Sequence, residues 1–197
     1  AGLDPVTCNA SCTTNASAPV AAIMMENPGV VKAMLNTVHG YTATQSLVDG
    51  PAKKDFRRGR AAAQNIVPST TGAAESVVQS LPELKNKFDG IAMRVPVACG
   101  SIVDFTFLAK RKTTVEEINE IFRKASRDPR WEKVLSVTED QIVSSDIIAD
   151  PHGAIVDLSL TRVVDGDLVK VLAWYDNEWG YSATLVEHVI RVGKLIK

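Results

Sequence analysis

The stretch Asn9-Ala10-Ser11-Cys12-Thr13-Thr14-Asn15-Ala16 decides the fold, because it predicts where the first helix begins. The residues before Cys12 are small and polar, and an apolar run from Val20 to Met25 follows it. We therefore predict that Ser11 is the N-cap and Cys12 the first helical residue. A thiol at that point lies beside free backbone N–H groups and the positive end of the helix dipole, which favour the thiolate and can stabilise an oxyanion. Cys12 is the candidate nucleophile.

The candidate base is His39, which ends an apolar run from Val30 to Val38 that predicts a buried strand. A lone histidine at a strand end is usually structural, and a free cysteine is more often a small buried residue than a reactive one. Together, an imidazole and a helix-start thiol can form a thiolate–imidazolium pair. We therefore predict that folding brings Cys12 and His39 within reach of each other.

Two further stretches predict binding sites for anions. The segment Ser69-Thr70-Thr71-Gly72-Ala73-Ala74 precedes an amphipathic stretch that ends before Pro82, so hydroxyls and free N–H groups meet at a helix start. A plain N-cap gives the same pattern and does not exclude a bound anion. Arg94 lies between apolar neighbours in a predicted strand from Ile91 to Val97, and its guanidinium can bind a phosphate through two hydrogen bonds.

Seven motifs then occur in an order that resembles one known family, the phosphorylating glyceraldehyde-3-phosphate dehydrogenases. They are Asn9–Asn15, Thr37–Gln45, Asp49–Pro51, Arg57–Ala62, Ser69–Ala74, Arg94–Pro96 and Trp174–Ser182. The match runs from about Asn9 to the end of the chain, and it covers only the catalytic half of that family. The chain departs from the family at Ala16, where many members have a second cysteine, and at Val97-Ala98-Cys99-Gly100, where the family usually has Thr-Pro-Asn-Val.

The resemblance implies oxidation of an aldehyde through a thioester on Cys12, with His39 as acid and base, hydride transfer to NAD and attack by inorganic phosphate. It implies that Arg94 and Thr42 bind the phosphate of a sugar-phosphate substrate. Phosphate binding, chiefly of the attacking phosphate, is implied for Ser11, Thr13, Thr71 and Gly72. Contact with the nicotinamide is implied for Asn177 and Tyr181. Pro51 matches members that prefer the cofactor without a 2′-phosphate. It also implies a homotetramer in the cytoplasm, in which the basic loop from Thr42 to Gln64 reaches a neighbouring subunit; a solvated basic loop is the alternative.

The pattern of elements predicts an α+β fold, a largely antiparallel mixed sheet with helices on one face, because the strands come in runs without regular helix alternation. A chain of 197 residues with 45% hydrophobic content suits one core. No Gly-x-Gly-x-x-Gly follows a strand, so we expect the N-terminal Rossmann domain to be absent, residues 1–8 to be a leader or truncated boundary, and 9–197 to be the catalytic domain. Further strands are predicted at 102–108, 141–144, 154–161 and 168–174. One further helix is predicted to begin at Thr114 with a capping box, and another is predicted at 182–197 with an apolar stripe.

Composition excludes several classes of protein. A net charge of −1 argues against a nucleic-acid binder, and no run approaches the ~20 apolar residues that span a bilayer, so we expect no membrane partner. The three cysteines, Cys8, Cys12 and Cys99, lack metal-ligand spacing, so we expect no metal and a reducing compartment. His152 and His188 have no partner in sequence and are expected to be surface or packing residues.

Three alternatives stay open. In the first, the chain alone is an isolated domain without redox activity. In the second, it is a cysteine hydrolase of esters, which would use the same Cys–His pair but not two phosphate sites. A related erythrose-4-phosphate dehydrogenase would act on a longer sugar. The residues do not decide between NAD and NADP or between three- and four-carbon substrates.

Overall fold

The computed structural model describes residues 6–53 and 55–196, which contain four α-helices, eight β-strands and three 3-10 turns. The helices are α1 (Cys12–Glu26), α2 (Ala73–Ser80), α3 (Val115–Ala125) and α4 (Trp179–Gly193). The strands are β1 (Val30–Gly40), β2 (Val67–Thr70), β3 (Phe88–Val95), β4 (Ser101–Ala109), β5 (Leu135–Thr138), β6 (Ala154–Asp157), β7 (Arg162–Val164) and β8 (Leu168–Tyr175). The 3-10 turns are Phe56–Gly59, Pro82–Leu84 and Leu158–Leu160.

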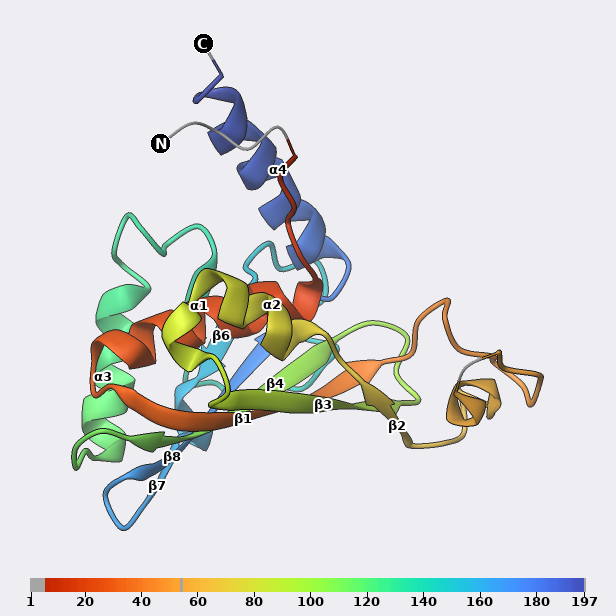
Figure 1. The fold of residues 1–197 in the computed structure, drawn as a ribbon, viewed down its shortest axis with the longest axis horizontal. Coiled ribbons are helices and arrows are strands. Elements are labelled where there is room, and N and C mark those ends of the chain that lie inside the picture. The colour runs from red at the N-terminus through yellow and green to blue at the C-terminus, as the bar shows by residue number, and fades with distance from the viewer. Residues whose placement is uncertain (1–5, 54, 197) are drawn as a thin grey trace.

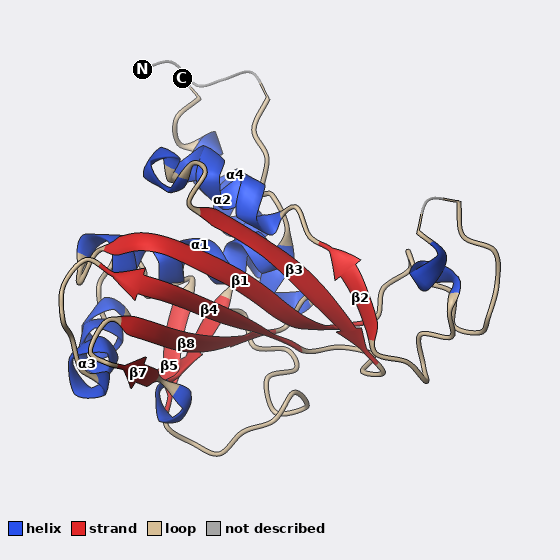
Figure 2. Ribbon diagram, turned by 60° about the horizontal axis from the view of Figure 1, so that its bottom comes forward, coloured by secondary structure: helices blue, strands red, loops and turns tan. Residues whose placement is uncertain are grey.

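All strands join one mixed sheet in the order β2-β3-β1-β4-β8-β6-β5, with β7 paired to β8. The pairs β1–β3 and β5–β6 are parallel, and the other pairs are antiparallel. Figures 1 and 2 show α1 and α2 on the same face of this sheet. The predicted α+β fold, a largely antiparallel mixed sheet with helices on one face, is therefore confirmed.

Helix α1 begins at Cys12, as predicted. The Ser11 hydroxyl accepts a hydrogen bond from the Thr14 backbone N–H at 3.1 Å, which supplies the N-cap. Most of the helix is buried, and it packs on β4, β6 and β8 and against the other helices. Pro19 lies inside α1 without ending it. A helix buried on so many sides holds the Cys12 end in a fixed place over the sheet.

Strand β1 alternates between the two faces of the sheet. Leu35, Thr37 and His39 are buried under the helices, whereas Met34 on the opposite face is 57% exposed. The parallel register of β1 and β3 places His39 directly opposite Arg94. This pairing brings the candidate base and the candidate phosphate-binding cation together.

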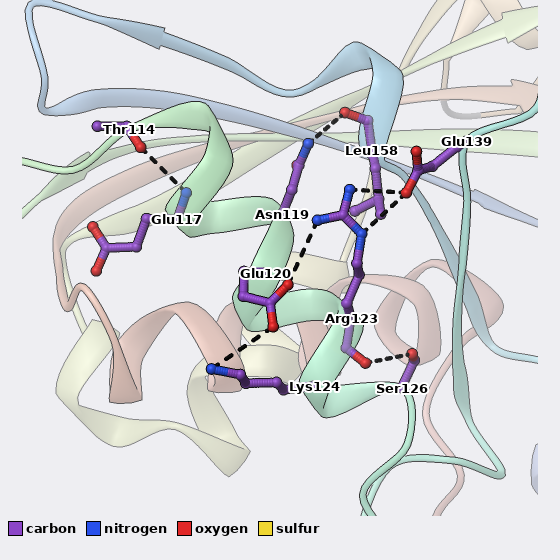
Figure 3. A network of polar contacts seen from close by, with 9 residues as sticks. All are labelled: Thr114, Glu117, Asn119, Glu120, Arg123, Lys124, Ser126, Glu139 and Leu158. Carbon is purple, nitrogen blue, oxygen red and sulfur yellow. Dashed lines mark hydrogen bonds and ion pairs between the residues drawn. The ribbon is translucent and has the colours of Figure 1, made fainter.

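Helix α3 is anchored by side-chain contacts at both ends (Figure 3). The Thr114 hydroxyl accepts from the Glu117 backbone N–H at 3.2 Å, so the predicted N-cap is confirmed. In a capping box the Glu117 carboxylate would accept from the Thr114 backbone N–H, whereas here it accepts from the Thr113 hydroxyl at 2.8 Å. The Asn119 amide donates to the Leu158 carbonyl at 2.9 Å. Arg123 donates to Glu139, and the apolar face of the helix is buried in the core at Ile118 and Phe122.

The strand predicted at 141–144 is wrong, because residues 141–143 are irregular and a turn begins at Ser144. The Asp146 carboxylate accepts the Val143 N–H at 2.7 Å, and a side-chain acceptor of this kind competes with strand pairing. The strand predicted at 154–161 ends at Asp157, whose carboxylate accepts from Ser159 and starts a 3-10 turn. Strands β2, β5 and β7 were not predicted; each has four residues or fewer.

Helix α4 begins three residues before the predicted Ser182 and ends at Gly193. It extends away from the sheet in Figure 1, with residues 6–11 running beside it. Most of the predicted apolar stripe is exposed: Val189 is 61% accessible, Ile196 lies beyond the end of the helix at 68%, and Val192 is half-buried. The expected end at Lys197 lies outside the described residues. None of the described helices is long and apolar enough to cross a membrane.

The two histidines outside the site have partners that the sequence did not reveal. His152 Nδ1 lies 2.7 Å from the Asp150 carboxylate, and this contact raises the pKa of His152. His188 Nε2 lies 3.0 Å from the Thr7 hydroxyl. His152 is therefore half of an ion pair when protonated, rather than a residue without a partner.

Candidate active site

A pocket of about 460 Å³ opens at the N-terminus of α1, and we call it the Cys12 pocket. Nine of the ten predicted site residues line it: Ser11, Cys12, Thr13, His39, Thr42, Thr71, Gly72, Arg94 and Asn177. They come from α1, β1, β3 and the segments before α2 and α4, so folding gathers distant parts of the chain. The tenth, Tyr181, lies half-buried in the first turn of α4 and does not line the pocket.

A larger hollow of about 1070 Å³ lies near the start of β1, lined by residues such as Met34, Lys85 and Leu168. Its lining contains no cysteine and no histidine. Nucleophilic catalysis requires an attacking group with a base beside it. The smaller Cys12 pocket is therefore the better candidate for the active site.

The nucleophile and the base meet in this pocket. Cys12 Sγ lies 3.5 Å from His39 Nε2. His39 is only 3% exposed, and its ring packs edge-on against the ring of Tyr175 at a centroid distance of 5.9 Å. The predicted Cys–His pair is thus present in the geometry that a proton transfer needs.

Burial controls the protonation of both groups. Burial, assisted by the positive charge of Arg94, lowers the pKa of His39 to about 4. Burial also raises the pKa of Cys12, and the weaker opposing effects of Thr13 hydrogen bonds and Arg94 do not cancel it. The backbone N–H groups of Cys12 and Thr13 at the helix start do lower the pKa of the thiol, as expected, but desolvation outweighs them.

Arg94 contacts the far side of the imidazole. Its Nη1 lies 2.7 Å from His39 Nδ1 and donates to the Gly40 carbonyl at 3.1 Å. A second cation, Arg58, donates to the Ser69 hydroxyl at 3.0 Å. Burial lowers the pKa of Arg94, and the charge of Arg58 adds a smaller effect in the same direction. Sequence reasoning had placed Arg58 only in the basic loop, although it lies in the Arg57–Ala62 motif.

Hydroxyls and free N–H groups surround the pocket on its other side. The Thr71 hydroxyl accepts from the Ala73 N–H at 3.2 Å, and Gly72 is an exposed N-cap that leaves the start of α2 open. The Ser11 hydroxyl lies 2.7 Å from that of Thr14. Hydroxyls and free N–H groups at a helix start are the kind of groups that bind anions, so the anion site stays a prediction that this geometry permits.

Tyr175 is a site residue that sequence reasoning missed. Its hydroxyl lies 2.9 Å from Thr13 Oγ1 and 2.7 Å from Thr37 Oγ1, and the side chain is 1% exposed. The hydroxyl of Thr13 therefore points toward Tyr175. In sequence, Tyr175 belongs to an aromatic cluster for which core packing is the default expectation.

The amide oxygen of Asn177 accepts from the Gly100 N–H at 3.0 Å and from the Ser101 hydroxyl at 3.1 Å. Its NH2 group is then the part left to bind a ligand. The neighbouring Asp176 carboxylate accepts from the Cys99 thiol at 3.2 Å. The segment that departs from the family pattern thus still supports Asn177. Among the described residues, no group of three or more His, Cys, Asp or Glu side chains is placed to hold a metal ion.

Comparison with known families identifies the family of this chain. The model of the family described as "Glyceraldehyde 3-phosphate dehydrogenase, C-terminal domain" matches residues 11–177. The chain belongs to this family. Membership in this glyceraldehyde-3-phosphate dehydrogenase family confirms the resemblance drawn from the seven motifs, and the match includes every residue that lines the Cys12 pocket except Ala10 and Glu178.

Individual members of the glyceraldehyde-3-phosphate dehydrogenase family are similar over nearly the whole chain. The glyceraldehyde-3-phosphate dehydrogenase of Streptomyces coelicolor is 53% identical over 185 residues, which cover 94% of this chain and 55% of the relative. The enzyme of that name from Mycobacterium tuberculosis is 49% identical over 193 residues, or 98% of this chain and 56% of the relative. The chain therefore spans little more than half the length of the relatives that it matches.

Proposed function

We propose that this chain is the catalytic domain of a phosphorylating glyceraldehyde-3-phosphate dehydrogenase, which oxidises an aldehyde through a thioester on Cys12. The observation that supports the proposal best is the 3.5 Å separation of Cys12 Sγ and His39 Nε2 beside Arg94. A nucleophile with a base in reach, and a cation next to the base, suits a phosphorylated carbonyl substrate.

The chemistry begins with proton transfer from the Cys12 thiol to His39 Nε2. The thiolate adds to the aldehyde carbon, a C–S bond forms, and the imidazolium returns the proton to the carbonyl oxygen. His39 then takes the hydroxyl proton while hydride leaves the same carbon, which yields the thioester. An oxygen of inorganic phosphate attacks the thioester carbon, the C–S bond breaks, and an acyl phosphate leaves with the Cys12 thiolate regenerated.

Two groups of residues serve the two phosphates in this proposal. Arg94 and Thr42 bind the phosphate of the substrate, while Ser11, Thr13, Thr71 and Gly72 bind the attacking phosphate. Arg58 adds positive charge beside Arg94. Both groups line the Cys12 pocket. A cysteine hydrolase of esters would have no use for a second anion site, so this arrangement favours the phosphorylating reaction.

NAD, when bound, supplies the hydride acceptor. Asn177 fits such a ligand, because its amide oxygen is already engaged and its NH2 group can donate to a carboxamide oxygen. Tyr181 is proposed to lie beside the nicotinamide ring. Most of the binding surface for NAD would come from outside this chain, and the exposed apolar residues of α4 suit packing against a further domain. By itself the chain is then an isolated domain that does not complete the redox step.

The proposal extends to a cytoplasmic homotetramer acting in glycolysis. The face of the sheet opposite α1 and α2 carries exposed apolar side chains, among them Met34 at 57% and Ile91 at 47%. Exposed apolar surface of this kind marks sites of association. The choice between a three-carbon and a four-carbon aldose phosphate is a property of the whole enzyme.

The reverse of the last step tests the proposal without NAD. We expect 3-phosphoglyceroyl phosphate to acylate Cys12 and release one phosphate per chain, as intact-mass spectrometry and a phosphate assay would show. Cys12→Ser should form no adduct, and Cys99→Ser should react like the unsubstituted chain. Acylation of Cys99 instead of Cys12, or no acylation at all, would overturn the assignment.

A further inference from the structure

The turn before Cys12 contains a strained residue. Ala10 has a φ of 55°, in the left-handed region that a side chain with a Cβ disfavours. It lines the Cys12 pocket, and among the described residues of that lining no other has a positive φ. Strain of this kind persists only where surrounding groups hold it in place. The contacts of the turn Asn9–Ser11 show which groups do so.

The side chain of Asn15 clamps this turn. Its Nδ2 donates to the Asn9 carbonyl at 3.0 Å and to the Ser11 carbonyl at 3.1 Å. Carbonyls only accept hydrogen bonds and an NH2 group has two hydrogens, so one amide serves both. The contact with Ser11, four residues earlier, is a local bond that helices commonly contain, whereas the contact with Asn9 reaches outside the helix and spans Ala10. Asn15 therefore fixes the chain on both sides of the strained residue.

The other contacts of the turn are weaker. The Ala10 N–H donates to Cys8 Sγ at 3.2 Å, and sulfur is a weak acceptor. The Asn9 amide donates to the Thr184 hydroxyl on α4 at the longer distance of 3.3 Å. Asn15, by contrast, belongs to α1, most of which is buried. The clamp thus ties the turn to the same rigid element that carries the nucleophile.

The clamp also fixes the direction of the Cys12 N–H. The Ser11 carbonyl accepts from the backbone N–H of Asn15 at 2.9 Å and from its side chain. In a trans peptide the C=O and the N–H point in opposite directions, so the Cys12 N–H points away from Asn15, at the open end of α1 where the Cys12 pocket lies. An N–H in the first turn of a helix has no partner within the helix, so it can donate to an oxyanion beside the sulfur.

We propose that Asn15 is a positioning residue for the reactions of Cys12. Its NH2 group keeps Ala10 left-handed, and the turn then holds the Cys12 N–H toward the oxygen of the carbonyl that the sulfur attacks. In that step a C–S bond forms and an electron pair of the C=O bond moves onto the oxygen, where a fixed donor stabilises the negative charge. Asn15 acts through the backbone and needs no contact with the substrate. The inference rests on the proposed function, because it takes carbonyl addition as the reaction of Cys12.

A role confined to α1 is the alternative explanation of the Asn15 contacts, and two variants separate it from positioning. Asn15→Ala removes the whole clamp. Asn15→Ser removes only its outer half, because a serine hydroxyl can still donate to the carbonyl four residues earlier. A role confined to α1 predicts that Asn15→Ser keeps the reactivity of Cys12. The positioning role predicts that both variants lose it, because neither side chain reaches the Asn9 carbonyl.

The positioning role acts on reactions that build an oxyanion. We expect Asn15→Ala and Asn15→Ser to slow the acylation of Cys12 at saturating 3-phosphoglyceroyl phosphate about tenfold or more, since loss of an entire oxyanion donor costs about 100- to 1000-fold. Alkylation by iodoacetamide displaces iodide and builds no oxyanion, so its rate should fall by far less. Asn65→Ala is the matched control, because Asn65 also donates to a carbonyl four residues earlier, that of Ala61 at 3.0 Å, and does not line the Cys12 pocket. Both of its rates should equal those of the unsubstituted chain.

Relief of the strain at residue 10 should restore part of what the clamp provides. Glycine adopts the left-handed conformation without the penalty of a Cβ, which corresponds to about fivefold or more in population. Ala10→Gly should therefore raise the acylation rate of Asn15→Ala about fivefold, and that of the unsubstituted chain by far less. A loss caused by a weakened helix would not be reversed by a change in the preceding turn. Equal losses of acylation and alkylation in Asn15→Ala, a double variant as slow as Asn15→Ala, or full acylation of Asn15→Ser would overturn the inference.

The φ of residue 10 gives a readout that needs no reaction, because the one-bond Cα–Hα coupling in NMR spectra distinguishes positive from negative φ. We expect a positive φ in the unsubstituted chain and a shift toward negative φ in both Asn15 variants, so one that folds poorly would not prevent a decision. If the unsubstituted chain is acylated and the coupling does not change in the variants, the inference is wrong and the proposed function stands. If the unsubstituted chain is not acylated, the proposed function is wrong, and the coupling still decides whether Asn15 holds the turn.

Discussion

The hydroxyl oxygen of Tyr175 lies 2.7 Å from the hydroxyl oxygen of Thr37, deep in the core. The same phenol lies 2.9 Å from Thr13 Oγ1 at the start of α1. Thr13 follows the candidate nucleophile, and Thr37 precedes the candidate base by two residues in β1. One side chain of β8 therefore fixes the spacing between the two elements that form the Cys–His pair.

Tyr175→Phe should destabilise the fold and slow the reactions of Cys12. Two buried hydroxyls lose a partner, which costs about 1–3 kcal/mol in the free energy of unfolding. Urea denaturation measures this cost, and Thr37→Val supplies the matched variant. The double variant should cost less than the sum of the two single variants, because each single variant already loses the hydrogen bond between the two hydroxyls. Strictly additive costs would show that the two groups do not interact.

Much of this site could be predicted because its signals are local. A capping serine before an apolar run predicts the start of α1, and Cys12 is therefore placed without any knowledge of the rest of the fold. The same reasoning predicts the anion site before α2. The pairing of Cys12 with His39 followed from residue types and from the ordered motifs, and the 3.5 Å contact confirms it.

What the sequence could not reveal depends on register and burial. Arg94 meets Nδ1 because β1 and β3 pair with His39 opposite Arg94, a register that no local pattern encodes. The raised pKa of Cys12 comes from desolvation, which is a property of the packed core. The segment 141–144 looks like a strand, but Asp146 takes the N–H that a neighbouring strand would need.

The stability of the chain should fall as pH drops through the range of His39. Its pKa is about 4 in the folded chain against 6.5 when unfolded, so between these values the unfolded state binds more protons. The stabilisation is complete above pH 6.5 and is lost as pH falls toward 4. We expect the unsubstituted chain to lose about 3 kcal/mol more over this window than His39→Gln, as measured by urea denaturation at each pH.

His152 supplies a control of opposite sign for this measurement. Its pKa is raised by Asp150, so the ion pair stabilises the fold below pH 6.5, and the effect disappears as pH rises through the folded pKa. His152→Gln should therefore be less stable than the unsubstituted chain in acid and close to it at high pH. A pH profile of equal slope for the His39 and His152 variants would contradict both assignments.

Cys99 should react with alkylating agents more slowly than the exposed Cys8 at moderate pH. Burial and the hydrogen bond to Asp176 raise its pKa to about 11, compared with 9.0 for an ordinary thiol. Two units of pKa reduce the thiolate fraction about 100-fold. Peptide mapping after iodoacetamide treatment at pH 8.5 should find Cys8, which is exposed, modified well before Cys99. Equal labelling of the two would show that the Asp176 contact is absent in solution.

Asp176→Asn tests the carboxylate that supports both Cys99 and the start of α4. This carboxylate is buried and accepts from the Cys99 thiol and from the backbone N–H groups of Ala149, Glu178 and Trp179. An amide would turn an NH2 group toward one of these donors and lose the charge. Bonds to a charged acceptor contribute about 1.5–3 kcal/mol each, so the variant should lose at least that much in the free energy of unfolding.

Cys99→Ala, which removes only one of the four donors, should cost less than about 1.5 kcal/mol. In Asp176→Asn, Cys99 should also become reactive at a lower pH, and if its alkylation profile does not move, the thiol does not donate to this carboxylate.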